Sequence, residues 1–221
     1  MTDNLSEYKY KKMAVESFEN GLRLYFDAVY LFNKGSYPSA LQLAIISLEE
    51  ISKSNWIEDY YWNSITNDGF PDYDFEQEWL NLLYKHPTKQ IAFFSWSLPM
   101  EYSPKFIKAV GQNELEILKQ KATYVGLRKQ KNKVDIKSRI SLPKNIKMNE
   151  PKRIISLLND YLTDVYKRKK AQGECYDLEE KDALINYGLF KQLKKWNYKT
   201  GLRSSKWTKQ WLDSLKETTM K

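Results

Sequence analysis

The stretch Gly35-Ser-Tyr37-Pro-Ser-Ala40, followed by Leu48-Glu49-Glu50-Ile51-Ser52-Lys53, decides the fold of this chain. A short polar turn precedes a helix whose apolar residues recur at helical spacing, so one face of that helix is predicted to be buried. Glu50 and Lys53 are three positions apart beside this face, where an ion pair can be half buried and its ionisation tuned. The alternative is an ordinary solvated pair, which stabilises a helix by roughly 0.2–0.5 kcal/mol.

The rest of the chain repeats this helical pattern. With 221 residues, of which 42 % are apolar and 14 % aromatic, the chain can bury a substantial core and is not mainly disordered. Only 8 glycines and 7 prolines interrupt the apolar periodicity. The sequence therefore predicts an all-α protein.

The helices are predicted from apolar periodicity and turn residues. The first two form an antiparallel hairpin, because only Lys34-Gly35-Ser36 connects them. We expect a bundle over residues 1–170 and a C-terminal helical extension over residues 171–221, which packs on the bundle or belongs to the same domain. The expected helices span about 5–33, 37–65, 74–85, 87–98, 104–124 (broken near Gly111), 151–170, 178–196 and 205–216.

Cysteine use and the N-terminus predict the compartment. Cys175 is the only cysteine, so no intrachain disulfide can form and a reducing cytosol is expected. The first residues lack the pattern of a secretory signal, and no stretch approaches the roughly 20 apolar residues that span a bilayer. We therefore expect a soluble, cytoplasmic protein that does not bind membranes.

The formal net charge of +8 is concentrated in residues 119–153, which hold twelve basic and two acidic residues. Such a local field attracts polyanions, RNA first among them, although a solvated loop that keeps the protein soluble is the alternative. The residues expected to bind RNA are Lys119, Lys121, Arg128, Lys129, Lys131, Lys133 and Arg139.

A single histidine, His86, restricts the possible chemistry. A zinc site with several histidines cannot be built within one chain, and no glycine-rich phosphate loop is present, so we expect no metal and no cofactor. Acid–base catalysis with two histidines requires a homodimer whose twofold axis brings two copies of His86 together. The alternative is a structural histidine. A nucleophilic pair of Cys175 with His86 has no supporting signature.

Aromatic and basic residues alternate from Trp196 to Trp211 near the C-terminus. Stacking aromatics beside cations can hold single-stranded RNA. However, Trp207, Trp211 and Leu215 follow one another at intervals of four, which favours a packed helix face.

The hairpin residues Asp27, Gly35, Tyr37, Ala40 and Glu49-Glu50-x-x-Lys53 resemble the AbiV abortive-infection family, which is placed among the HEPN helical domains. His86-x-x-Lys89 resembles the H-x-x-K element of this family. The later tyrosine-and-proline segment of the family resembles Leu118-Lys-Gln-Lys-Ala-Thr-Tyr124-Val125, followed by Leu142-Pro143, in this chain. The resemblance covers about residues 10–165.

The resemblance implies a bacterial antiphage protein that halts growth or translation when it senses a phage, built on a HEPN-like antiparallel helical bundle that dimerises. Many HEPN domains are metal-independent ribonucleases with an arginine four to six residues before a histidine. Residues 79–86 contain no arginine, so the catalytic site would be a variant one. Its residues would be Glu49, Glu50, Lys53, His86 and Lys89.

The leading hypothesis is a homodimeric antiphage effector that cleaves host or phage RNA once a phage-encoded protein activates it. His86 would move the proton of the reacting hydroxyl, Lys53 and Lys89 would stabilise the phosphate, and Glu49 or Glu50 would orient them or act as the second acid or base. The competing hypothesis is a binding protein without enzymatic activity, which engages a phage protein or the translation machinery and uses these residues as a structural network. A third is a helical partner that neutralises another toxin.

Overall fold

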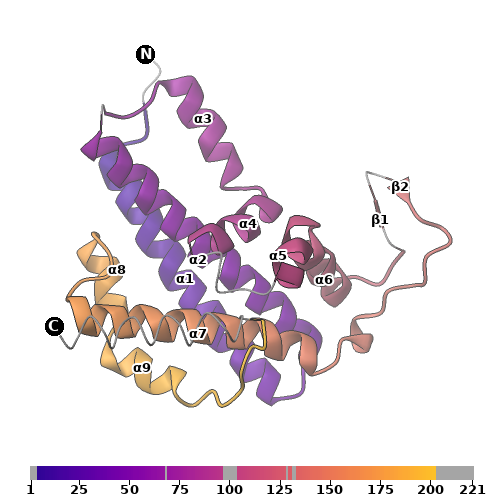
Figure 1. Ribbon diagram of the computed structural model, residues 1–221. Coiled ribbons are helices and arrows are strands. Elements are labelled where there is room, and N and C mark those ends of the chain that lie inside the picture. Colours follow the sequence, from indigo (N-terminus) through magenta and orange to yellow (C-terminus); the bar gives the residue numbers. More distant parts are fainter. Residues whose placement is uncertain (1–3, 68, 97–103, 128, 131–132, 203–221) are drawn as a thin grey trace.

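A hairpin of two long helices is the centre of the fold (Figure 1). The computed structural model describes residues 4–67, 69–96, 104–127, 129–130 and 133–202, in which α1 spans Glu7–Asn33 and α2 spans Tyr37–Thr66. Gly35 takes a φ of 76° between the two helices. The N–H of Ser36 donates to the carbonyl of Leu31, which closes the end of α1 and turns the chain back.

A close approach at Gly21 fixes how α1 packs on α2. A Cβ at Gly21 would lie 2.6 Å from Cγ1 of Ile51, so a larger side chain would push the helices apart. The hydroxyl of Ser47 donates to the carbonyl of Gly21 at 2.7 Å, and that of Ser54 donates to the carbonyl of Ala14 at 2.6 Å. These buried bonds set the register of the hairpin.

The remaining helices pack around this hairpin, and the all-α fold expected from the sequence is confirmed. The expected break near Gly111 separates α5 (Pro104–Gly111) from α6 (Glu114–Thr123). The single helix expected over 178–196 is wrong: it divides into α8 (Glu179–Leu184) and α9 (Tyr187–Leu193), because Asn186 caps a new helix by accepting from the N–H of Leu189 at 3.0 Å. The helix expected over 205–216 lies outside the described residues. The helices are α3 (Tyr73–Leu82), α4 (His86–Trp96), α5 (Pro104–Gly111), α6 (Glu114–Thr123), α7 (Asn149–Gln172), α8 (Glu179–Leu184) and α9 (Tyr187–Leu193).

The main core lies between the hairpin and α7, which crosses both hairpin helices (Figure 1). Ile185, Leu189 and Leu193, at and after the end of α8, are buried in this same core. A smaller cluster around Tyr10 and Trp79 joins the start of α1, the end of α2 and α3. The division of the chain at residue 170 stays a prediction, although the described part of the extension shares the core of the bundle.

The basic segment after α6 leaves the bundle as an extended arm (Figure 1). The short strands β1 (Lys129–Gln130) and β2 (Lys133–Val134) pair antiparallel, and Gly126 pairs with Ser141 at the base of the arm. Ile136 and Ile140 are largely exposed on it. The arm returns through a 3-10 turn at Pro143–Asn145 to the start of α7.

Candidate functional site

Three helices that contact one another bring polar side chains together around Glu49. Glu49 lies in the middle of α2, while His86, Lys89 and Gln90 lie at the start of α4 and Lys119 lies on α6. The spacing of the α4 residues places all three within about one turn. The site thus depends on how α4 and α6 dock against the hairpin.

Glu49 is the centre of this cluster and is completely buried. Its Oε2 lies 2.6 Å from Nδ1 of His86, and its Oε1 accepts hydrogen bonds from Gln90 Nε2 at 2.8 Å and from Lys119 Nζ at 2.9 Å. An ionised carboxylate only accepts hydrogen bonds, so a contact with ionised Glu49 requires a proton on Nδ1 of His86, and Nε2 is the ring nitrogen that does not contact Glu49. Since the His86 side chain is 53 % exposed, the ring is open to solvent.

Two more carboxylates share the lysines of the cluster. Lys119 Nζ lies 2.7 Å from Oε2 of Glu116, and Lys89 Nζ lies 3.6 Å from Oε1 of Glu50 and 4.0 Å from Oε2 of Glu49. The lysine side chains are only 11 % and 8 % exposed. Each lysine is therefore held between two carboxylates and shielded from solvent.

The charges of the cluster do not cancel. The cluster contains three carboxylates and two ammonium groups, so its negative charge exceeds its positive charge by one when the histidine is neutral. These groups belong to Glu49, Glu50 and Glu116 and to Lys89 and Lys119. Burial acts to raise the pKa of Glu116, but the hydrogen bonds from Lys119 and from a neighbouring glutamine outweigh it and lower that pKa.

An open pocket of about 370 Å³ lies over the cluster. His86 and the exposed Tyr124 belong to its lining, so a molecule in the pocket can reach the imidazole ring. The lining residues are Gln42, Ile46, Glu49, Glu50, His86, Lys89, Glu116, Lys119, Gln120, Thr123 and Tyr124.

The structure brings together Glu49, Glu50, His86 and Lys89 but not Lys53. The ion pair expected between Glu50 and Lys53 does not form in the described part of the chain, because Glu50 reaches Lys89 on α4 instead. Nζ of Lys53 lies 5.6 Å from the centre of the Tyr84 ring. Lys53 therefore lies beside the cluster rather than in it.

Sequence reasoning missed Gln90 and Glu116, and it assigned Lys119 to the wrong environment. Lys119 was expected on a surface that binds RNA, yet it is buried and bonded to Glu49. The spacing of Glu116 and Lys119 on α6 is the one local signal of their pairing.

Of the other residues expected to bind RNA, the described ones (Lys121, Lys129, Lys133 and Arg139) lie on or beside the arm. Lys121 and Arg139 line a second pocket, of about 480 Å³, at the base of the arm. This pocket shares Gln120 and Tyr124 with the pocket over the cluster, so the two pockets are neighbours. Lys133 is exposed on β2. Arg128 and Lys131 lie outside the described residues, and only the backbone of Lys129 is described.

The remaining candidates have structural roles. Cys175 donates from Sγ to the carbonyl of Val165 at 3.1 Å, and burial raises the pKa of its thiol. Trp196 packs against Phe32 with ring centres 5.1 Å apart, and its indole N–H donates to Ser156. Trp207 and Trp211 lie outside the described residues.

No group of three or more histidine, cysteine or acidic side chains among the described residues could hold a metal ion. None of the helices within the described ranges is long and apolar enough to cross a membrane.

Fold and site together define a class of protein: an all-α bundle built on a long helical hairpin, with a buried ionic cluster beneath a half-exposed histidine. The sequence model of the AbiV family of HEPN domains matches residues 9–163, from α1 into α7, and this range contains the whole cluster. The chain belongs to the AbiV family, which is a family of abortive-infection HEPN proteins. No curated protein and no solved structure matches the chain significantly.

Proposed function

We propose that this abortive-infection protein is a phage-activated effector that cleaves RNA without a metal ion, with His86 as its acid–base group. The observation that carries the proposal is the contact between buried Glu49 and half-exposed His86. A carboxylate that holds Nδ1 fixes the orientation of the ring, and the other ring nitrogen, Nε2, can then act as a general base on a molecule in the pocket that His86 lines. Glu49 is then a positioning residue.

The neighbouring pocket supports RNA as the substrate. It adjoins the His86 pocket at Tyr124, and Lys121 and Arg139 line it. An exposed tyrosine beside cations suits stacking of a base together with contacts to phosphates. We propose that a single strand of RNA lies along this path, with the basic arm holding its backbone.

The proposed cleavage step needs one base and one acid. His86 Nε2 takes the proton of a ribose 2′-OH, the 2′-oxygen attacks the adjacent phosphorus, and the bond from phosphorus to the 5′-oxygen breaks. The leaving 5′-oxygen takes a proton from the acid. Because each chain has one histidine, we propose that a homodimer supplies a second His86 as this acid.

The test is the integrity of RNA in phage-infected cells that produce wild-type protein, His86→Ala or the control Gln192→Ala, which alters an exposed residue of α9. We expect discrete RNA fragments with the wild type and with the control. With His86→Ala at the same protein level, we expect intact RNA. Fragments of equal abundance with His86→Ala would remove His86 from the mechanism.

One observation favours a second function. The cluster already has an excess of negative charge, which does not attract a phosphate. A network of this kind can instead fix the bundle of a binding protein that engages a phage protein or the translation machinery. If the protein acts by binding alone, cells with His86→Ala should remain protected against phage and their RNA should stay intact. Incorporation of labelled amino acids should still stop in these infected cells.

A further inference from the structure

The carboxylate of Glu49 divides its two oxygens between different partners. Oε2 contacts Nδ1 of His86 at 2.6 Å, whereas Oε1 accepts hydrogen bonds from Gln90 Nε2 at 2.8 Å and from Lys119 Nζ at 2.9 Å. Because Glu49 is completely buried, bulk solvent does not compete for either oxygen. The two bonds to Oε1 therefore fix how the carboxylate is turned and where Oε2 meets the imidazole ring.

Lys119 is the stronger of the two anchors on Oε1. Its ammonium group is charged, and a charge-assisted hydrogen bond to a carboxylate is stronger than one from a neutral amide. Glu116 holds the same Nζ at 2.7 Å, and the side chain is nearly buried, so the ammonium has little freedom to move. Lys119 lies on α6 and His86 on α4, so the orientation of the ring depends on a helix that does not carry it.

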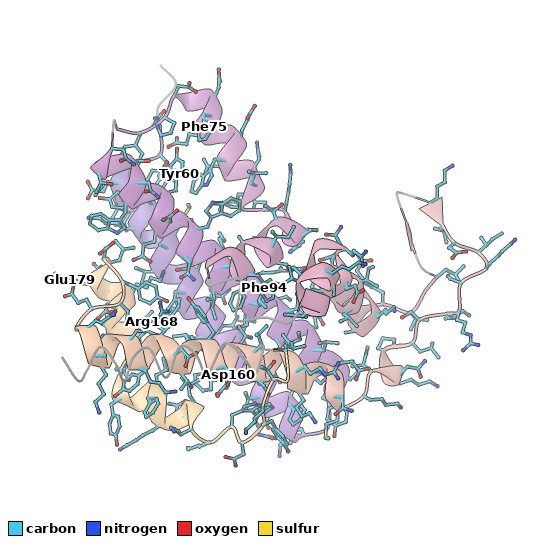
Figure 2. All side chains as sticks on the ribbon, viewed as in Figure 1. Tyr60, Phe75, Phe94, Asp160, Arg168 and Glu179 are labelled. Carbon is cyan, nitrogen blue, oxygen red and sulfur yellow. The ribbon has the colours of Figure 1, made fainter. Side chains whose placement is uncertain are left out.

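Gln90 is the second anchor and shares a helix with the histidine. It lies four residues after His86, which places both side chains on one face of α4. Its Nε2 donates to Glu49 at 2.8 Å and approaches Glu116 at 3.4 Å, while its own buried Oε1 has no partner among the described residues. One turn further on, Phe94 is buried in the main core and ties α4 to the bundle (Figure 2). The orientation of the Gln90 amide thus serves the carboxylate of Glu49.

Lys89 belongs to the same cluster but does not hold this carboxylate in the same way. Its Nζ lies 4.0 Å from Oε2 of Glu49 and 3.6 Å from Oε1 of Glu50, both beyond the usual range of about 2.7–3.2 Å for a hydrogen bond. Lys89 and Lys119 carry the same charge and are both nearly buried. Comparing the two lysines therefore separates the effect of a hydrogen bond to Glu49 from the effect of a charge beside it.

We propose that Lys119 and Gln90 are positioning residues for His86. By occupying Oε1 of Glu49 they leave Oε2 to hold a proton on Nδ1 of the neutral ring, and Nε2 remains free to take a proton from another molecule. Lys119 then acts through Glu49 and does not contact RNA. The use of this arrangement rests on the proposed cleavage of RNA, but the state of the ring can be measured without any substrate.

The test exploits the single histidine, because every imidazole signal of the chain comes from His86. Long-range 1H–15N NMR of the full chain, prepared without a histidine tag, shows which ring nitrogen carries the proton at a pH where the ring is neutral. We expect the proton on Nδ1 in the wild type. In Lys119→Met we expect the averaged signals of a ring that exchanges between its two tautomers. Lys89→Met is the matched control: it removes the same charge and should keep the wild-type signals.

Gln90→Met keeps the test valid if Lys119→Met does not fold. It removes an uncharged donor together with an acceptor that has no partner among the described residues, so the fold should persist while the ring signals shift toward the average. A proton on Nε2 in the wild type would overturn the proposal. Wild-type signals in folded Lys119→Met, or in Gln90→Met where the first variant does not fold, would also overturn it, as would an equal change in Lys89→Met.

Cleavage of RNA is measured separately, so that the two proposals can fail independently. In phage-infected cells, Lys119→Met and Gln90→Met at the protein level of the wild type should each give at least ~10-fold fewer RNA fragments, which corresponds to about 1.4 kcal/mol in the barrier. Equal fragments from the wild type and both variants would overturn the positioning role while RNA cleavage stands. Intact RNA with the wild type, together with the expected NMR signals, would refute the proposed cleavage and support the positioning of the ring.

Discussion

Lys119→Met tests the ionic cluster most sharply, because methionine keeps an unbranched chain of similar length and removes only the charge. Lys119 Nζ lies 2.9 Å from Glu49 and 2.7 Å from Glu116. Without it, three carboxylates would share Lys89 alone. Removing one partner of a buried ion pair typically costs about 3–5 kcal/mol. At about 2–4 °C for each kcal/mol in a chain of this length, the melting temperature should fall by roughly 6–20 °C.

Urea unfolding followed by circular dichroism measures this loss as a change of midpoint at constant slope. Lys121→Met is the matched control: it lies two residues further along α6, is exposed, and should change the free energy of unfolding by less than about 0.5 kcal/mol. If Lys119→Met stays within about 1 kcal/mol of wild type, the lysine is not part of a buried network and the description of the site is incorrect.

Three further changes probe other parts of the molecule. Gly21→Ala should destabilise the protein by about 1–3 kcal/mol in urea unfolding, because its Cβ would lie 2.6 Å from a side-chain atom of α2; a stabilised variant would contradict the close packing. Lys53→Ala should cost less than about 1 kcal/mol in thermal melts, because only its cation–π contact with Tyr84 is lost; a loss of about 3 kcal/mol would return Lys53 to the buried network. Stability should fall as the pH rises through about 10, because burial raises the pKa of Tyr25 and of Tyr161. The unfolded chain then releases these protons first and the folded state binds more of them, at up to about 1.4 kcal/mol per pH unit for each tyrosine; equal urea midpoints at about pH 9 and about pH 11 would contradict this.

Most of the helices could be predicted because their signals are local. Apolar spacing and the turn at Gly35 placed α1 and α2 within two residues of their observed ends. The division of residues 178–196 into α8 and α9 was missed, because apolar periodicity continues across the junction. The hydrogen bond from the N–H of Leu189 to the side chain of Asn186 starts a new helix there, although the apolar pattern continues.

The site was less predictable, because its contacts join residues far apart in the chain. His86 stood out as the single histidine, but its place in one site with Glu49 and Lys89 was expected only from the family resemblance, since nothing in their local spacing shows that α4 docks on α2. The partner of Glu50 could not be read from helix spacing, which favoured Lys53 three residues away over Lys89 on another helix. The buried position of Lys119 was not predicted, because the basic residues that follow it in the sequence indicated an exposed, positively charged surface.

The chemistry of the RNA ends tests the central claim most directly. Attack by the 2′-oxygen leaves a 5′-hydroxyl on the downstream fragment. Sequencing of 5′-hydroxyl ends from phage-infected cells should therefore show new ends with wild-type protein and none with His86→Ala. Fragments that carry only 5′-phosphates, or protection against phage with no new ends at all, would contradict cleavage by His86.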